Sequence, residues 1–215
     1  MKINLPTKLT IVRIVLTFAL LVFLVVAYCA GLNGWVDRQL FEHGPYLVGT
    51  IACAVFIVAS LTDSLDGYLA RKWNQVTNLG KFLDPIADKM LVNSMLVFSA
   101  IPFAFMPNAL TTPWFCVVLM IIRDLIVDTM RLMAAKKNIV VPANIFGKLK
   151  TVFQMVALPI VLLNGFPFSF FDEGWHPLLR IGSILIYLAT LMSLISGIIY
   201  IKANWSVLKE DNDHE

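Results

Sequence analysis

The segment Asp63-Ser-Leu-Asp-Gly-Tyr-Leu-Ala-Arg71 is followed, after eight further residues, by Gly80-Lys-Phe-Leu-Asp-Pro-Ile-Ala-Asp88. Strongly apolar runs lead into the first segment and out of the second. Four acidic side chains therefore gather where two apolar helices follow one another along the chain. Acidic residues are costly inside a membrane and are usually functional there. This junction is the first place to look for both the fold and the chemistry.

Helical spacing arranges the acidic residues in two stripes. Residues three or four positions apart share one face of a helix. The stripes are Asp63, Asp66, Gly67 and Ala70 on the first helix and Gly80, Asp84 and Asp88 on the second. A short loop joins the two helices, so we expect antiparallel neighbours whose acidic ends face each other.

The composition of the whole chain predicts a membrane protein. Of its 215 residues, 59% are hydrophobic and only 14% are charged, whereas soluble domains average roughly half apolar and a quarter charged. A helix needs about 20 apolar residues to cross a bilayer. Six apolar segments occur, at roughly 9–30, 46–66, 83–105, 113–135, 147–165 and 178–202. We therefore predict an all-α, polytopic membrane protein, a six-transmembrane-helix bundle formed by residues 1–215 as a single domain.

The distribution of basic residues predicts the orientation of this bundle. Six spans place both termini on the same side of the membrane. Of the 17 Lys and Arg residues, all except Arg38 and Arg180 fall on that side. Because positive charge is retained on the cytoplasmic side, we predict cytoplasmic N- and C-termini in the cell membrane. The four aspartates then lie at the cytoplasmic ends of their helices.

Four carboxylates in a low-dielectric site repel one another strongly, so we expect a cation between them. The set has neither His nor Cys, and oxygen ligands favour Mg²⁺ or Mn²⁺ over zinc. Such ions often act as a pair on phosphate groups. Arg71 and Lys81 carry the charge to bind phosphate oxygens. Gly67, Ala70 and Gly80 leave room for a nucleotide or for close helix packing. The alternative is that the acids are ordinary solvated charges at a helix end.

The complete pattern resembles a known family signature. Asp63-x2-Asp66-Gly67-x2-Ala70-Arg71-x8-Gly80-x3-Asp84-x3-Asp88 is similar to the motif of the CDP-alcohol phosphotransferase family, with every position filled. Eight fixed residues at fixed spacing are highly specific, and the six-span layout extends the resemblance to essentially the whole chain. The resemblance implies an enzyme of phospholipid biosynthesis that transfers a phosphatidyl or similar group from a CDP-linked lipid to an alcohol and releases CMP.

The resemblance also implies roles for individual residues. Asp63, Asp66 and Asp84 would hold divalent metal ions. Asp88 would share the metal site and act as the general base on the incoming hydroxyl. The CDP-lipid site would comprise Asp63, Asp66, Gly67, Ala70, Arg71, Gly80 and Lys81.

Three further segments resemble bacterial members of the family that use glycerol 3-phosphate as the acceptor. They are residues 4–13, residues 122–125 with Arg131, and residues 147–151 with Gln154. The acceptor phosphate would be bound by Arg123, Arg131, Lys148, Thr151 and Gln154, a cationic pocket beside the aspartates. The expected substrates are CDP-diacylglycerol and glycerol 3-phosphate, and the expected products are phosphatidylglycerol phosphate and CMP.

Some features leave the acceptor open. Asp124 stands where those enzymes more often carry Glu, and Asp128 stands where a small or hydroxylated residue is usual. We expect Asp128 to pair with Arg131 or Arg123 and to reduce the positive charge of the pocket. Basic residues could instead anchor the chain to anionic headgroups, namely Arg131, Lys136, Lys137, Lys148 and Lys150. Inositol phosphate, serine and phosphatidylglycerol are the alternative acceptors.

Other classes of protein fit less well. A nucleic-acid-binding protein would carry a run of basic residues interleaved with aromatic residues. The sequence has no such run. A cation-coupled small transporter would carry internal repeats or helices broken at mid-membrane, whereas the acids here gather at one end. Cys29, Cys53 and Cys116 lie far apart in apolar runs and are expected to be small buried hydrophobes. The family resemblance suggests a homodimer among membrane lipids, and small residues in the spans permit close helix contacts.

Overall fold

The computed structural model describes residues 4–31, 46–72, 77–101, 110–137, 144–172 and 174–205. In these ranges the chain forms six long α-helices and two short 3₁₀ helices, and it forms no strand there. The elements are α1 (Leu5–Gly31), α2 (Leu47–Lys72), α3 (Asn78–Ala100), α4 (Trp114–Lys136), α5 (Ile145–Leu162), η1 (Phe168–Phe170), η2 (Pro177–Leu179) and α6 (Ile181–Ala203). The predicted all-α fold is confirmed.

The helices extend beyond the apolar runs at the acidic junction. α2 continues to Lys72, and α3 already begins at Asn78. Thr77 caps α3, because its side chain accepts a hydrogen bond of 3.0 Å from the backbone N–H of Gly80. Such a cap satisfies one of the otherwise unpaired N–H groups of the first turn. Hydropathy detects only the apolar part of a helix, so the predicted spans 46–66 and 83–105 missed these polar turns.

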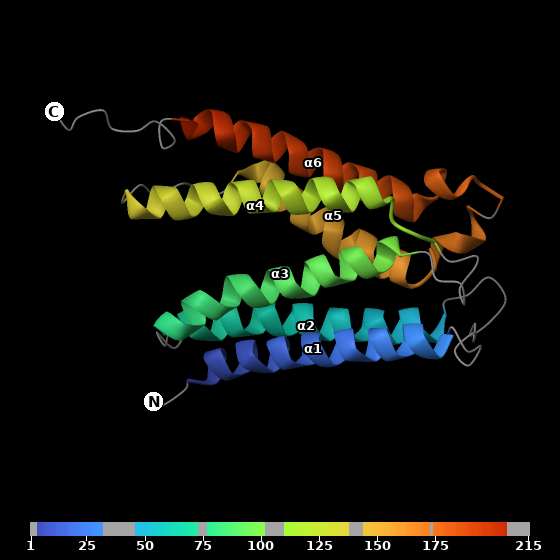
Figure 1. Ribbon diagram of the computed structural model, residues 1–215, viewed down its shortest axis with the longest axis horizontal. Helices are drawn as coiled ribbons and strands as arrows, with labels where there is room; N and C mark the ends of the chain where they lie inside the picture. Colours follow the sequence, from blue (N-terminus) through green and yellow to red (C-terminus); the bar gives the residue numbers. More distant parts are fainter. Residues whose placement is uncertain are drawn as a thin grey trace.

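The six helices run alternately up and down the bundle (Figure 1). α1, α3 and α5 begin at one end, and α2, α4 and α6 end there. We call this end, which contains Asp63, Asp84, Asp88, Arg131 and Lys148, the polar end. The arrangement agrees with an even number of crossings. Which side of a membrane the polar end faces remains a prediction.

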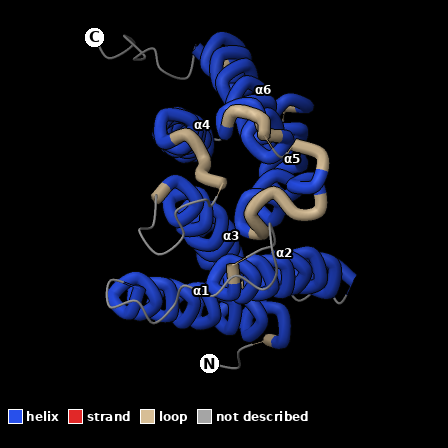
Figure 2. Tube along the Cα trace, turned by 90° about the vertical axis from the view of Figure 1, so that its right-hand side faces the viewer, coloured by secondary structure: helices blue, strands red, loops and turns tan. Residues whose placement is uncertain are grey.

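Helix α3 occupies the centre of the bundle. It contacts α1 and α2 on one side and α4 and α5 on the other. Figure 2, which looks along the bundle, shows α1 and α2 below α3 and shows α4, α5 and α6 above it. α3 therefore joins two groups of helices, α1–α2 and α4–α6. A residue on α3 can face either group, depending on its position around the helix.

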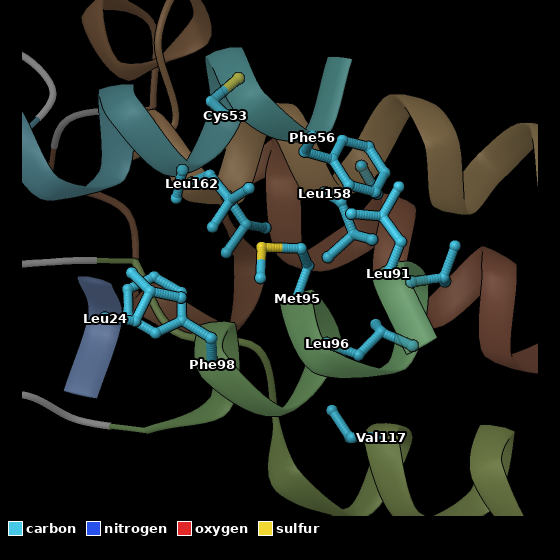
Figure 3. Packing of buried hydrophobic residues seen from close by; sticks show 14 of the residues in the cluster. Leu24, Cys53, Phe56, Leu91, Met95, Leu96, Phe98, Val117, Leu158 and Leu162 are labelled. Atoms are coloured by element: carbon cyan, nitrogen blue, oxygen red, sulfur yellow. The ribbon is translucent and has the colours of Figure 1, made fainter. Parts of the chain in front are cut away.

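The core lies where side chains of α3 interleave with those of its neighbours (Figure 3). Met95 and Leu96 of α3 are fully buried, and Phe56 of α2 and Leu158 of α5 pack into the same cluster. Burial of such side chains stabilises a fold by about 1.5–3 kcal/mol each in water. The cluster fixes α3 against both groups of helices and so sets the positions of its first turns.

Two of the three cysteines behave as predicted. Cys53 and Cys116 are buried in this cluster. Cys29 is exposed near the end of α1, so the prediction of burial is wrong there. The apolar run around it faces outward on α1, where an apolar residue needs no cover inside a membrane.

The outer surface of the bundle supports a membrane location. Valines recur on the outward face of α1, and Val15, Val22 and Val25 are each about 60% exposed. Among the described residues, three helices are long and apolar enough to cross a membrane: α1, α5 and α6. The apolar part of α2 is shorter, and α3 and α4 carry charges within their length. The membrane location is thus supported, while the count of six spans remains a prediction.

Candidate active site

Helix α1 orients two of the predicted metal-binding aspartates. Arg13, only 1% exposed, forms an ion pair with the carboxylate of Asp63 near the end of α2. One turn earlier, Thr10 donates a hydrogen bond of 2.8 Å from Oγ1 to Oδ1 of Asp84 on α3. A buried arginine needs a partner of opposite charge. The first helix thus supplies a cation and a hydroxyl that hold carboxylates of both neighbouring helices.

Thr10 and Arg13 were not predicted as site residues, although both belong to the segment 4–13. Two signals in the sequence point to them. Arg13 is a charge within an apolar run, which is costly in a membrane without a function or a partner. Thr10 lies three residues earlier and therefore shares its helix face.

Gly80 allows α1 and α3 to approach closely. A Cβ atom at this position would lie 3.1 Å from Oγ1 of Thr77 and 3.3 Å from Oγ1 of Thr7. These two hydroxyls are themselves hydrogen-bonded at 2.8 Å, which links α1 to the cap of α3. Of the two explanations offered for Gly80, the contacts favour close helix packing.

Several predicted site residues lie outside the described side chains. Asp66, Gly67, Ala70 and Arg71 lie in α2 and Lys81 lies in α3, but only the backbone is described there. The metal-binding and CDP-binding roles expected for them therefore remain predictions.

The described aspartates offer suitable donors for a hard cation. Asp63 and Asp88 are close enough to interact electrostatically, and the side chain of Asp63 is 44% exposed. Asp84 is exposed as well. Among the described side chains, no three His, Cys, Asp or Glu residues are grouped tightly enough to hold a metal ion, and Asp66 is outside that set. Carboxylate oxygens that solvent can reach fit Mg²⁺ or Mn²⁺ by their chemistry.

A polar cavity of about 240 Å³ opens at the polar end among α3, α4, α5 and α6. Asp88 lies in its wall, and so do all five residues predicted to bind the acceptor phosphate. These five are Arg123, Arg131, Lys148, Thr151 and Gln154. These five residues lie 35 to 66 positions after Asp88 in the sequence, and they surround one space with it. The structure brings the predicted acceptor residues together.

A largely buried ionic cluster forms one side of this cavity. Arg123 donates from Nη1 to Oδ1 of Asp124 at 2.9 Å and from Nη2 to Oγ of Ser196 on α6 at 2.6 Å. Lys150 of α5 donates to both carboxylate oxygens of Asp124. Asp124 is therefore shared by two cations from different helices. Both terminal nitrogens of Arg123 are already engaged by the protein.

Two glycines make room for the Arg123 side chain. A Cβ atom at Gly197 would lie 2.9 Å from Cγ of Arg123. A Cβ atom at Gly147 would lie 3.1 Å from Oγ of Ser196 and 3.6 Å from Nη2 of Arg123. Contacts under about 3 Å force a neighbour to move. A larger residue at position 197 would therefore displace the Arg123 side chain, which passes between α4 and α6.

The remaining predicted acceptor residues differ in exposure. Arg131 and Lys148 are exposed, and the Arg131 guanidinium carbon lies 5.5 Å from the centre of the Tyr200 ring. Gln154 is buried and donates from Nε2 to the sulfur of Met120 at 3.2 Å. Thr151 donates from Oγ1 to the backbone oxygen of Gly147 at 3.2 Å. Arg131 and Lys148 are thus the most accessible cations among the five.

One expectation about Asp128 and one alternative considered for Lys150 are wrong. Asp128 forms its ion pair with Lys89 of α3, not with Arg131 or Arg123. Its helix face meets α3, where Lys89 follows Asp88. Lys150 is only 6% exposed, so it cannot anchor the chain to headgroups. A signal for Lys150 was available, because it lies four residues before Gln154 and shares that helix face.

Comparison with known proteins agrees with this geometry. The profile of the CDP-alcohol phosphatidyltransferase family matches residues 3–196. The chain therefore belongs to this family of membrane enzymes, whose members generally use divalent metal ions.

Similar proteins include three that are named CDP-diacylglycerol–glycerol-3-phosphate 3-phosphatidyltransferase. The protein of Bacillus subtilis (strain 168) is 34% identical over 209 residues, 97% of this chain and 99% of the relative. That of Mycoplasma pneumoniae is 33% identical over 222 residues, covering 96% and 89%. That of Rickettsia typhi is 34% identical over 201 residues, covering 93% and 96%.

Proposed function

We propose that this protein transfers the phosphatidyl group of CDP-diacylglycerol to glycerol 3-phosphate, giving phosphatidylglycerol phosphate and CMP. The observation that carries the proposal is the cavity at the polar end. Asp88 shares its wall with Arg123, Arg131 and Lys148. A base and a set of cations around one space suit an alcohol that carries a phosphate group. The names of the three relatives support the same acceptor.

Asp88 acts as the general base in this proposal. Its carboxylate accepts the proton of the acceptor hydroxyl, whose oxygen attacks the phosphorus of the phosphatidyl group. The bond from that phosphorus to the CMP oxygen then breaks. The electrostatic neighbours of Asp88 include Arg13, Lys89 and Lys150. Burial and the carboxylate of Asp63 oppose the ionised form of Asp88, and these cations favour it. Divalent ions bound beside Asp88 would add to the cations and favour the ionised carboxylate, which is the form that can take up a proton.

Asp63, Asp66, Asp84 and Asp88 would hold a pair of divalent ions, Mg²⁺ or Mn²⁺. Such ions neutralise the diphosphate and stabilise CMP as the leaving group. Arg13 and Thr10 hold Asp63 and Asp84 in place for this purpose. Gly67, Ala70, Arg71 and Lys81 would complete the CDP-lipid site, and Gly80 would contribute by letting α1 and α3 pack closely beside it.

The acceptor phosphate is bound by Arg131 and Lys148, whose exposed side chains line the cavity. Arg123, Thr151 and Gln154 shape the pocket behind them. Ion pairs between Arg and a phosphate are among the strongest polar contacts, because two N–H groups can donate in parallel. The buried cluster around Asp124 keeps the walls of the pocket in position.

We further propose that residues 1–215 act as one domain in the cell membrane, with the polar end and both termini in the cytoplasm. Glycerol 3-phosphate is a soluble, charged metabolite, so a polar end facing the cytoplasm gives it access. A homodimer is proposed from the family resemblance alone.

An acceptor panel tests the proposed function. Purified protein in detergent with CDP-diacylglycerol and Mg²⁺ or Mn²⁺ is given glycerol 3-phosphate, inositol phosphate, serine or phosphatidylglycerol, and CMP release is measured. We expect release with glycerol 3-phosphate and little with the others. Release with another acceptor and none with glycerol 3-phosphate would overturn the proposal while retaining the reaction class.

A further inference from the structure

Three buried polar groups in the wall of the cavity lack a hydrogen-bond partner in the described part of the chain. One is Nε of Arg123, whose two Nη atoms are bonded within the protein. The other two are Oη of Tyr200, near the end of α6, and Nδ2 of Asn144, which precedes α5. Tyr200 is only 4% exposed. Nearly all buried polar groups in folded proteins are hydrogen-bonded, because leaving one unpaired is costly. Such unpaired groups beside one cavity therefore call for a ligand.

Only the side-chain oxygen of Asn144 is needed for the helix. Its Oδ1 accepts a hydrogen bond of 3.2 Å from the backbone N–H of Phe146 and so caps α5. Ser or Asp would cap this position about equally well. The amide nitrogen has no part in capping. Asn thus adds a hydrogen-bond donor to the cavity that the helix itself does not require.

Tyr200 also carries a group that its structural role does not require. Its ring lies against the guanidinium of Arg131, with 5.5 Å between the guanidinium carbon and the ring centre. This cation–π contact uses the face of the ring, and phenylalanine would provide it too. The cation–π contact therefore does not need the hydroxyl. Tyr200 lines the cavity beside Arg131, one of the two accessible cations.

We propose that Tyr200 Oη and Asn144 Nδ2 donate hydrogen bonds to the phosphate of the acceptor and so help to select a phosphorylated alcohol. The inference rests on the proposed function. Both groups can donate, and phosphate oxygens are strong acceptors. Arg131 and Lys148 attract any anion, but charge alone discriminates weakly among acceptors. Two neutral donors at fixed positions, one at the start of α5 and one on α6, add the directional part of the recognition.

The test compares variants that remove each donor and keep its structural role. Tyr200→Phe keeps the ring, Asn144→Ser keeps the cap, and Asn144→Asp keeps both cap and size but replaces the donor with an anion. Tyr187→Phe is the matched control, because Tyr187 lies on the same helix and stacks on Phe115 away from the cavity. For each protein, KM for both substrates, kcat and the thermal midpoint are measured.

We expect Tyr200→Phe and Asn144→Ser to raise KM for glycerol 3-phosphate roughly tenfold, the effect of losing one hydrogen bond to a charged group. Asn144→Asp should raise it further by repulsion. KM for CDP-diacylglycerol, kcat and the thermal midpoint of these variants should stay near the wild-type values. In Tyr187→Phe, both KM values, kcat and the thermal midpoint should stay near the wild-type values. An unchanged KM for glycerol 3-phosphate in the first two variants, with or without a lower thermal midpoint, overturns the inference.

The wild-type measurement separates this inference from the proposed function. If wild-type protein uses a different phosphorylated acceptor, the proposed function fails, and the same KM comparison is made with that acceptor. If the acceptor used has no phosphate group, both the proposed function and the inference fail.

Discussion

The two sides of the polar end use charged residues in opposite ways. On the side of α1–α3, which we call the acidic half, the carboxylates of Asp63 and Asp84 are held by α1 and remain exposed. On the side of α4–α6, the basic half, Arg123 and Lys150 are largely withdrawn from solvent and share Asp124. Asp88 on α3 lies between the halves, interacting with Asp63 and lining the basic cavity.

This difference separates charges available to ligands from charges that stabilise the fold. An exposed carboxylate keeps free lone pairs for a cation, whereas a buried pair has already exchanged water for its partner. In the basic half, Arg131 and Lys148 are therefore available to bind a substrate. Arg123 is engaged by Asp124 and Ser196, although the sequence alone does not distinguish it from Arg131. The predictions below test this division.

The largest effect should follow the replacement of Asp88, where the halves meet. Asp88→Asn removes the proposed base while preserving size, so turnover should fall about 10²–10⁴-fold. CMP release measures the loss, and an unchanged thermal midpoint verifies that the variant folds. Turnover above about a tenth of wild type would show that another group takes the proton.

Asp124 should matter to stability far more than Asp128. Asp124→Asn leaves Arg123 and Lys150 without their shared carboxylate, and breaking a buried pair costs about 3–5 kcal/mol. Asp128→Asn breaks a pair whose side chains are about one-third exposed, which costs about 0–1 kcal/mol. Thermal unfolding in detergent compares the two. Equal shifts would mean that the ionic cluster has no special structural role.

Arg13 should have an intermediate effect. Arg13→Met leaves Asp63 unpaired, but that carboxylate is 44% exposed and can be hydrated. We therefore expect a loss of about 2 kcal/mol, less than for a fully buried pair. Arg13→Met combined with Asp63→Asn should recover part of the loss. If the double variant is no more stable than Arg13→Met, packing of the long side chain, not the ion pair, is what stabilises α1.

The smallest effect concerns the charge of the cavity. Asp128→Asn frees Lys89 and makes the cavity more positive. KM for glycerol 3-phosphate should fall about two- to fivefold at low ionic strength, and the difference should shrink as salt screens the charges. A higher KM would mean that the Lys89–Asp128 pair itself holds the substrate.

The two halves also differ in how far the sequence could predict them. The acidic half is encoded by one segment with fixed spacing, so Asp63, Asp84 and Asp88 were found together. Their partners Thr10 and Arg13 come from a distant helix and depend on how α1 packs against α2 and α3. In the basic half, Arg123, Arg131 and Lys148 were located by the resemblance of their segments to bacterial members of the family. Spacing within a helix cannot reveal that Asp128 meets Lys89 or that Lys150 turns inward, because these contacts depend on crossings between helices.

The division between the halves is tested most directly by two-substrate kinetics on a pair of variants. Arg131→Met removes an accessible cation of the basic half, and Thr10→Val removes the hydrogen bond that holds Asp84 in the acidic half. We predict that Arg131→Met raises KM for glycerol 3-phosphate at least tenfold and leaves KM for CDP-diacylglycerol unchanged. Thr10→Val should leave KM for glycerol 3-phosphate unchanged and raise KM for CDP-diacylglycerol. If Arg131→Met instead raises KM for CDP-diacylglycerol alone, the basic half binds the lipid substrate and the assignment is contradicted.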